Sequence, residues 1–296
     1  MSISSEALSR ARSFLFVPAT RPERFAKALA SGADAVIIDL EDAVAPRDKG
    51  AARDQLSNAF GQFTAAELDR LVVRVNAGGT PWFDDDMKLL QSLARQGLGA
   101  AMLPKAESVA VLQNMAQSLG STCALMPLIE SLAGFDAVDA LARVSQVLRL
   151  AFGNLDFQAD LGLACAPDET ELVPVRLAVV MAARRAGLAA AIDGVTIDTK
   201  DAVQLQLDTA RSRRAGFGAK LCIHPMQVAV VNTAFAPSAS ELDWARRVLA
   251  AVAAAGGGVV SLDGRMVDGP VALLARRTLA QIRLLPQTQS DASYSE

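Results

Sequence analysis

Eight short apolar runs, each followed by a segment long enough for a helix, are the feature that most limits what this sequence can fold into. The runs cover residues 14–17, 35–39, 71–75, 100–103, 124–128, 147–152, 191–195 and 219–223. Strands that alternate with helices predict βαβ units and a parallel sheet. Eight such units in about 250 residues predict an α/β fold, a closed (β/α)8 TIM barrel. The alternative is an open doubly wound sheet, but no G-x-G-x-x-G motif follows the first run.

The pattern changes after the eighth run. Residues 238–255 predict a helix capped by Ser238, residues 259–267 predict a hairpin, and Pro270 opens a last helix. We therefore expect a catalytic barrel domain over residues 1–236 and a C-terminal helical and hairpin extension over residues 237–296. Because the extension is surplus to the barrel, it is expected to act as a lid or an oligomerisation arm.

Charge and hydropathy exclude several classes of function. The net charge of −3 and the pI near 5.4 do not provide the broad basic surface that nucleic-acid binding requires. The longest uncharged apolar run, residues 248–262, is too short to span a bilayer, and residues 1–12 lack the apolar stretch of a signal peptide. The three cysteines show no C-x-x-C spacing. We expect a cytoplasmic protein with a small-molecule substrate and neither nucleic-acid nor membrane partners.

Polar residues stand at or just after the end of nearly every predicted strand. They are Glu41, Asp42, Arg74, Asn76, Lys105, Glu130, Asp156, Asp193 and His224, and Pro18 follows the first run. Any one of them taken alone is explained as a helix cap or a solvated loop charge. Because the C-terminal ends of barrel strands meet at one face, the set predicts one acidic pocket that contains a few cations.

Glu130 and Asp156 are the candidate metal ligands. Each follows closely on an apolar run, and a charge in such a place must be paired, protonated or bound to a metal. Two carboxylates that leave coordination positions open suit Mg²⁺, which keeps waters and accepts substrate oxygens. The alternative is that Glu130 caps a helix that begins near Leu132 and that Asp156 pairs with an arginine.

Three basic residues have competing interpretations. The planar guanidinium of Arg74 suits bidentate binding of a substrate carboxylate, or else forms a structural salt bridge with Glu41 or Asp42. A barrel lysine such as Lys105 can form a Schiff base, but an ion pair with an acid at a strand end is favoured. His224 is the only histidine, and we favour a structural or orienting role for it.

Several motifs together resemble the citrate lyase β-subunit and malyl-CoA lyase family of the HpcH/HpaI aldolase superfamily. They occur in the same order along the chain and stand at residues 13–18 (SFLFVP), 32–44 (GADAVIIDLEDAV), 74–76 (RVN), 103–105 (LPK), 128–131 (LIES) and 223–225 (IHP). The resemblance extends from residue 13 to about residue 280. It implies a TIM barrel in a homo-oligomer, a trimer or hexamer, that makes or breaks a carbon–carbon bond in a hydroxyacyl-CoA.

The resemblance also implies roles for individual residues. Glu130 and Asp156 would hold Mg²⁺, Arg74 would bind the carboxylate of an oxo acid, and Glu41 and Asp42 would support the waters of the metal. Phe16 and Pro18 are expected at the substrate pocket.

The segment 264–270 resembles a lid whose aspartate reaches the site of a neighbouring subunit, so Asp268 is the candidate catalytic acid and base. Without the resemblance, Asp268 would be interpreted as an exposed turn aspartate. Around Asp156 the chain reads GNLDF at residues 153–157, where the family commonly carries another acid before the aspartate. A histidine base of the wider superfamily is not expected either, because residues 39–42 read DLED.

Three functions compete on this evidence. The first is a stand-alone Mg²⁺-dependent lyase that splits a malyl-, citramalyl- or citryl-CoA-like thioester into an acyl-CoA and an oxo acid. The second is a citrate lyase β-type subunit that acts on a thioester carried by a partner protein. The third is a non-catalytic acyl-CoA-binding module. A tail that bears Asp268 favours the first, and acids at both metal positions argue against the third.

Overall fold

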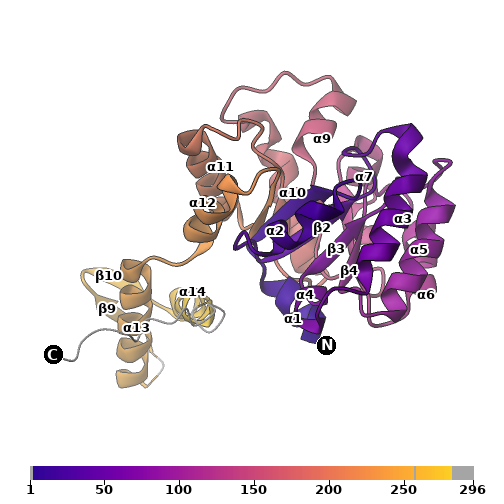
Figure 1. Ribbon diagram of the computed structural model, residues 1–296. Coiled ribbons are helices and arrows are strands. Elements are labelled where there is room, and N and C mark those ends of the chain that lie inside the picture. Colours follow the sequence, from indigo (N-terminus) through magenta and orange to yellow (C-terminus); the bar gives the residue numbers. More distant parts are fainter. Residues whose placement is uncertain (1–2, 257, 282–296) are drawn as a thin grey trace. The chain divides into compact units, whose positions relative to one another are not determined.

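In the computed structural model of the protein, which describes residues 3–256 and 258–281, eight parallel strands close into one barrel (Figure 1). Each strand pairs with the next along the chain, and β8 pairs with β1. The strands are β1 (Ser13–Pro18), β2 (Ala35–Asp39), β3 (Leu71–Arg74), β4 (Ala100–Leu103), β5 (Ala124–Ile129), β6 (Ala151–Phe152), β7 (Ile192–Asp193) and β8 (Ala219–Cys222). The predicted TIM barrel is confirmed.

Two strands are much shorter than the apolar runs that predicted them. The run 147–152 forms a strand only at β6, and Val147 makes one isolated bridge to Leu125. The run 191–195 forms a strand only at β7, which pairs with β6 at a single register position. The expectation of full-length strands was wrong here, because an apolar run shows that a segment is buried but not that its backbone groups find strand partners.

Helices surround the barrel, one or more after each strand (Figure 1). They are α1 (Ile3–Arg10), α2 (Phe25–Leu29), α3 (Lys49–Phe60), α4 (Ala65–Leu68), α5 (Phe83–Arg95), α6 (Val109–Leu119), α7 (Leu132–Asp136), α8 (Val138–Leu141), α9 (Asn154–Leu161), α10 (Val173–Arg185), α11 (Ala202–Ala215) and α12 (Met226–Phe235). Among residues 3–256 and 258–281, no helix has the length and apolar character needed to cross a membrane.

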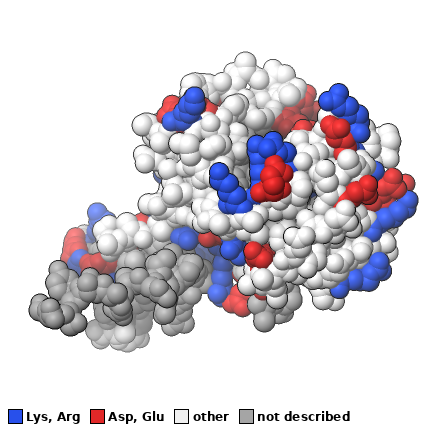
Figure 2. All heavy atoms as spheres, viewed as in Figure 1, with Lys and Arg blue, Asp and Glu red and all other residues white. Residues whose placement is uncertain are grey.

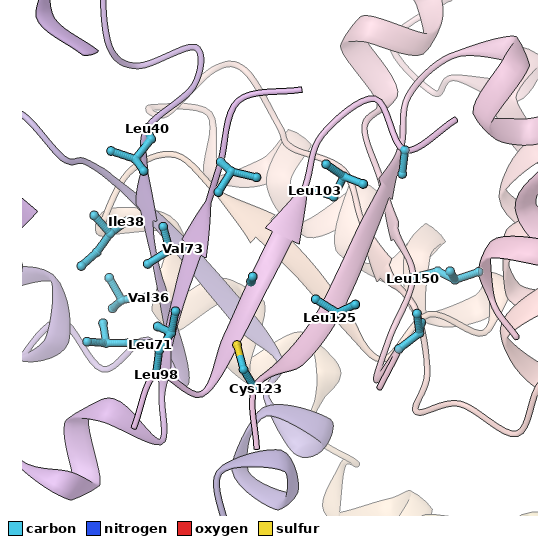
Figure 3. Packing of buried hydrophobic residues seen from close by; sticks show 14 of the residues in the cluster. Val36, Ile38, Leu40, Leu71, Val73, Leu98, Leu103, Cys123, Leu125 and Leu150 are labelled. Atoms are coloured by element: carbon cyan, nitrogen blue, oxygen red, sulfur yellow. The ribbon is translucent and has the colours of Figure 1, made fainter. Parts of the chain in front are cut away.

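The strands are buried on both faces. In β2, Val36 and Ile38 belong to the layer between the sheet and the helices, and Ala35 and Ile37 belong to the layer inside the barrel. This alternation follows from the two-residue period of a strand. Figure 3 shows side chains of the outer layer, among them Val36, Ile38 and Val73. With both faces covered, each strand is rigid, so the residues at its C-terminal end are held in fixed positions.

A buried arginine joins segments that precede the strands. The guanidinium of Arg149 is about 1% exposed and donates hydrogen bonds to the backbone carbonyls of Leu8 (3.1 Å), Ala11 (2.6 Å) and Ala190 (2.6 Å). Ala11 and Ala190 precede β1 and β7, so Arg149 fastens the N-terminal end of the barrel, opposite to the end where the strands finish.

The chain divides into two compact units, residues 1–235 and residues 236–296. The second unit contains α13 (Ala239–Ala254), a hairpin of β9 (Val260–Leu262) and β10 (Arg265–Val267), and α14 (Gly269–Ala280). Ser238 and Glu241 form a capping box at the start of α13, as the position of Ser238 predicts. Val248 and Val267 lie in a small hydrophobic core of this unit.

Candidate active site

Asp39 and Arg74 form a buried ion pair at the ends of β2 and β3. The two residues are register partners, and Arg74 donates from Nε to Oδ1 of Asp39 at 2.7 Å and from Nη2 to Oδ2 at 2.8 Å. Asp39 also accepts the backbone N–H groups of Glu41 and Ala43, each at 3.0 Å. The two-pronged edge of the guanidinium therefore binds a carboxylate of the protein itself. The expected role of Arg74 as a substrate ligand stays a prediction and concerns its remaining edge, Nη1.

Glu41 occupies that remaining edge. Its Oε2 lies 2.8 Å from Nη1 of Arg74, yet the angles of the contact do not make a hydrogen bond, so this buried oxygen has no hydrogen-bond partner. Burial, helped by the charges of Asp42 and Asp39, raises the pKa of Glu41 to about 7 despite the opposing effect of Arg74. Asp42, the next residue, is exposed. Of the expected acidic pair, Glu41 is the buried member.

A lysine from α3 holds the loop that carries Glu41. Lys49 is buried, and its Nζ donates to the backbone carbonyls of Leu40 (2.8 Å) and Glu41 (2.7 Å). Asn76 donates from Nδ2 to the same carbonyl of Leu40 at 3.1 Å. The turn after β2 is thus fixed by two side chains that reach it from outside the strand.

Glu130 directly follows β5 and is about 3% exposed. Its Oε1 accepts the backbone N–H of Lys105 at 2.8 Å. A Cβ at Gly153 would lie 2.6 Å from the Cβ of Glu130, so the close approach of these two segments requires glycine there. Burial raises the pKa of Glu130 to about 8, and the charge of Glu41 adds to the effect. Ser131 caps α7 by accepting from the backbone N–H of Gly134, so the alternative that Glu130 is the cap is wrong.

Lys105 joins the acids at the ends of the strands. Its Nζ lies 3.2 Å from Oδ1 of Asp156, in the first turn of α9, and 3.9 Å from Oε1 of Glu41. Burial lowers the pKa of Lys105, but the charges of Glu130, Asp156 and Glu41 outweigh it and raise the pKa above its ordinary value. A protonated lysine is a poor Schiff-base nucleophile. The favoured ion pair is present, and the partner of Asp156 is a lysine rather than an arginine.

We call the ends of β2–β6 the barrel mouth, and its charges do not balance. Five carboxyl groups and three cations interact there, in a set consisting of Asp39, Glu41, Asp42, Glu130, Asp156, Lys49, Arg74 and Lys105. The buried Oε2 of Glu41 lacks a hydrogen-bond partner. Within the described parts of the chain, no three His, Cys, Asp or Glu side chains converge into a metal cage. Hard oxygen donors, few in number and in excess of the local positive charge, fit a divalent cation that keeps part of its water shell, as Mg²⁺ does.

Phe16 and Pro18 lie beside the Asp39–Arg74 pair. The ring centroid of Phe16 is 4.6 Å from Cζ of Arg74, a cation–π contact, and Pro18 is the register partner of Asp39. Their place at the end of β1 is where a substrate that contacts Arg74 would also meet them. Figure 2 shows one face of the molecule, on which basic and acidic side chains lie next to one another over the barrel unit.

Two residues at the ends of β7 and β8 have structural partners. Asp193 is fully buried and accepts from Nε of Arg176 at 3.0 Å and from the hydroxyl of Ser212. Although burial raises its pKa, the charges of Lys220 and Arg176 outweigh this effect and lower it. The expectation that Asp193 joins the acidic pocket was therefore wrong, because a basic residue from α10 neutralises it. His224 accepts the backbone N–H of Met226 through Nδ1 at 3.2 Å, which caps α12.

Asp268 belongs to the second unit. Its Oδ1 accepts the backbone N–H of Val271 at 3.2 Å and caps α14, a good helix-start interaction. Its catalytic role stays a prediction.

Three residues that shape the site did not stand out in the sequence. They are Asp39, Lys49 and Gly153. The position of Asp39 at the end of an apolar run is a signal that could have identified it. Lys49 lies in a segment that reads as a surface helix, and nothing in that pattern indicates that its ammonium group is buried.

Comparison with known proteins places this barrel in a family. The HpcH/HpaI aldolase/citrate lyase family matches residues 12–225. The citrate lyase subunit beta-like protein of Mycobacterium tuberculosis (strain ATCC 25618 / H37Rv) is 38% identical over 263 residues, which are 87% of this chain and 90% of that protein. The citrate lyase subunit beta of Escherichia coli (strain K12) is 33% identical over 288 residues, which are 92% of this chain and 93% of that protein.

A solved structure extends the match to the fold. The crystal structure of protein CitE from Mycobacterium tuberculosis, in complex with magnesium, acetoacetate and coenzyme A, has a TM-score of 0.80 and 36% identity, and the match covers 92% of this chain and 98% of that one. The barrel, its charged mouth and these matches define the protein as a carbon–carbon lyase by class. The chain belongs to the HpcH/HpaI aldolase/citrate lyase family.

Proposed function

We propose that this protein is a Mg²⁺-dependent lyase that cleaves a hydroxyacyl-CoA into an acyl-CoA and an oxo acid, or runs the reverse condensation. The observation that carries the proposal is the surplus of carboxyl groups over cations at the barrel mouth, where the ammonium of Lys105 lies near Glu41 and Asp156 and its backbone N–H donates to Glu130. The magnesium, acetoacetate and coenzyme A of the CitE structure support the choice of ligands.

Glu130 and Asp156 would hold the metal, and Glu41 and Asp42 would bind the waters that complete its shell. When bound, Mg²⁺ supplies Lewis-acid polarisation of the carbonyl of the oxo acid. Within the same site, the ammonium of Lys105 would bind and orient the carboxylate of that acid, and Nη1 of Arg74 would do so in place of its contact with Glu41. Phe16 and Pro18 would form the adjacent wall.

A thioester α-carbon is a very weak acid, so a positioned base is needed to remove its proton. We propose that the carboxylate of Asp268 takes the α-proton in the condensation direction, while the alkoxide formed on the oxo acid takes up a proton from solvent. In the cleavage direction, the substrate hydroxyl loses its proton to solvent as the carbon–carbon bond breaks, and the protonated Asp268 gives its proton to the α-carbon. We also propose that the second unit, which carries Asp268, is the lid and that the protein works as a homotrimer or homohexamer.

The first test is an assay of purified protein without any partner. Cleavage of malyl-CoA or citramalyl-CoA should need Mg²⁺, stop with EDTA, and fall by at least about 10³-fold in Glu130→Gln or Asp156→Asn. Glu107→Gln is a matched control, since Glu107 accepts from the hydroxyl of Ser131 rather than contacting Lys105. Activity that persists with EDTA would overturn the metal assignment.

The second test separates the two roles of Asp268. Asp268→Ser keeps a side-chain oxygen that can cap α14 but has no carboxyl group, whereas Asp268→Ala loses both. If Asp268 is the acid and base, the Ser variant should keep the melting temperature of the wild type and still lose turnover by about 10²–10⁴-fold. A Ser variant with normal turnover would show that the residue is only a cap.

A citrate lyase β-type subunit is the second candidate, and the similarity to the Escherichia coli subunit favours it. That match covers 92% of this chain, so it extends into the second unit. The argument that a C-terminal tail distinguishes a stand-alone lyase from a complex subunit therefore fails. Cleavage by the isolated protein would exclude the subunit function and, equally, a non-catalytic acyl-CoA-binding module.

A further inference from the structure

Asn154 opens α9 two residues before Asp156, and its buried amide joins this helix to the segment after β7. Its Oδ1 accepts the backbone N–H of Val195 at 2.9 Å, and its Nδ2 donates to the carbonyl of Val195 at 3.2 Å. Strands β6 and β7 pair at only one register position. Beyond that position the side-chain amide of Asn154 takes the place of the next backbone rung and ties the two strand ends together.

The amide of Asn154 packs directly against the backbone of Gly194, where no side chain fits. A Cβ at Gly194 would lie 2.0 Å from Oδ1 of Asn154. No rotation of a neighbouring side chain relieves an overlap of that size while the bonds to Val195 are kept. Asn154 and Gly194 therefore form a matched pair.

A second bond from the amide reaches Glu169, in the loop before α10. Nδ2 of Asn154 donates to Oε1 of Glu169 at 2.8 Å, and Nε2 of Gln158 donates to the same oxygen at 3.3 Å. The other oxygen of Glu169 accepts from Arg176 and Arg211. Glu169 has a φ of +45°, a left-handed conformation that costs a non-glycine residue about 1 kcal/mol, so these four donors hold the loop in a strained shape.

This arrangement needs an amide at position 154. The side chain must donate to Glu169 and to the carbonyl of Val195, and accept from the N–H of Val195. In an aspartate, a carboxylate oxygen would replace Nδ2. This oxygen would face Oε1 of Glu169 and the carbonyl oxygen of Val195, and none of the three atoms could donate a hydrogen bond to another. An aspartate at position 154 would therefore be repelled here by Glu169 and by the carbonyl of Val195.

We propose that Asn154 and Glu169 are positioning residues that fix the first turn of α9 and thereby place Asp156 for metal binding. This rests on the proposed function, in which Asp156 is a metal ligand. Residues that orient a ligand without touching the metal typically contribute 10–100-fold to metal affinity. The Asn154–Glu169 hydrogen bond also joins the loop before α10 to α9. A shift of that loop would therefore change the position of Asp156.

The test measures metal binding by the full chain without substrate, by titration with Mn²⁺ followed by EPR. Asn154→Leu removes the amide without adding charge and should weaken Mn²⁺ binding by about 10–100-fold. The matched control is Gln227→Leu. Gln227 is a buried amide that accepts the N–H of Ile223 and donates to the carbonyl of Thr196, each at 2.9 Å, and so anchors the same segment after β7 without bonding to α9. The control should lower the melting temperature and leave the Mn²⁺ affinity within about threefold of the wild type.

Exchanging the charged and the neutral side chain at positions 154 and 169 distinguishes a positioning role of Asn154 from a direct electrostatic effect on the metal. Asn154→Asp adds a negative charge near the metal, which by Coulomb attraction alone would tighten binding. Positioning predicts the opposite: weaker Mn²⁺ binding in Asn154→Asp, and partial recovery in Asn154→Asp/Glu169→Gln, where the donor and acceptor between residues 154 and 169 are exchanged but the carbonyl of Val195 still lacks its donor.

The outcomes distinguish the two proposals. If the wild type binds Mn²⁺ and Asn154→Leu binds it equally well, or if Asn154→Asp binds it more tightly with no effect of the second substitution, the positioning role is overturned. If Asn154→Leu does not fold, the exchange pair decides the question. Failure of the wild type to bind any divalent ion would instead overturn the proposed function, and this inference with it.

Discussion

Replacing Asp39 with asparagine tests whether the Asp39–Arg74 pair is the anchor of the barrel mouth. The two oxygens of Asp39 accept four hydrogen bonds, two from Arg74 and one each from the backbone of Glu41 and Ala43. An asparagine has one acceptor oxygen, so either orientation of its amide leaves one N–H of Arg74 and one backbone N–H without an acceptor. It also leaves the buried guanidinium with Glu41 as its remaining ion-pair partner.

The expected loss of stability follows from those contacts. A charge-assisted hydrogen bond and a backbone hydrogen bond together contribute about 3 kcal/mol, and breaking a buried ion pair costs about 3–5 kcal/mol. The matched control is Asp139→Asn. Arg185 binds Asp139 in the same two-pronged geometry, at 2.8 Å for each bond, but each side chain is 47% exposed. Such a surface pair contributes about 0.5 kcal/mol.

Urea unfolding of both variants at the same pH, followed by circular dichroism, gives the two free energies by linear extrapolation. Asp39→Asn should lower the unfolding free energy by at least about 3 kcal/mol more than Asp139→Asn does, without a change in m-value that would indicate a different unfolded state. Equal losses in the two variants would refute the reasoning, because they would show that burial adds nothing to an identical pair.

Three further predictions follow from the same region and from the opposite end of the barrel. Burial raises the pKa of Glu130 from 4.5 to about 8, so the folded protein binds a proton that the unfolded chain has lost. Without metal, stability should therefore fall as the pH rises from 4.5 to about 8, and urea unfolding should show a flatter slope for Glu130→Gln; an unchanged slope would contradict the shift. Gly153→Ala forces a Cβ against Glu130 and should cost about 1–3 kcal/mol and weaken Mn²⁺ binding, whereas Gly50→Ala, in α3 with open space around it, should raise stability by up to about 1 kcal/mol. Arg149→Met leaves three backbone carbonyls without their donor and should lower the unfolding free energy by about 3 kcal/mol without changing Mn²⁺ affinity.

The barrel could be predicted from the sequence because its signal is local and repeated. Runs such as 35–39 and 100–103 coincide with β2 and β4, since a strand covered on both faces is apolar along its whole length. The same signal overestimated β6 and β7. Their neighbours stay buried without strand pairing, and a side-chain amide, that of Asn154, replaces backbone partners at the strand ends.

The site was harder to predict, because position along the chain tells which residues reach the barrel mouth but not how they pair. Arg74 was expected to use its fork on a substrate, yet that fork binds Asp39, the residue beside it in the neighbouring strand. Asp193 was expected in the pocket, yet Arg176 reaches it from a helix 17 residues away in the chain. Strand register determines the partner of Arg74, and helix packing determines the partner of Asp193. Neither partner can be predicted from a short sequence motif.

The barrel contains two groups of acids at its strand ends, and the difference in their charge compensation supports the proposal that one of them is the metal site. Around Asp193, Arg176 and Lys220 supply enough positive charge to lower the pKa of the carboxyl despite complete burial. Around Glu130 the opposite holds, because Lys105 and Arg74 do not offset burial and the neighbouring acids, and the pKa rises to about 8. Carboxyl groups crowded in this way do not stabilise the folded chain unless a further cation joins them. The undercompensated cluster, rather than the better buried one, is therefore where we propose that a divalent metal binds.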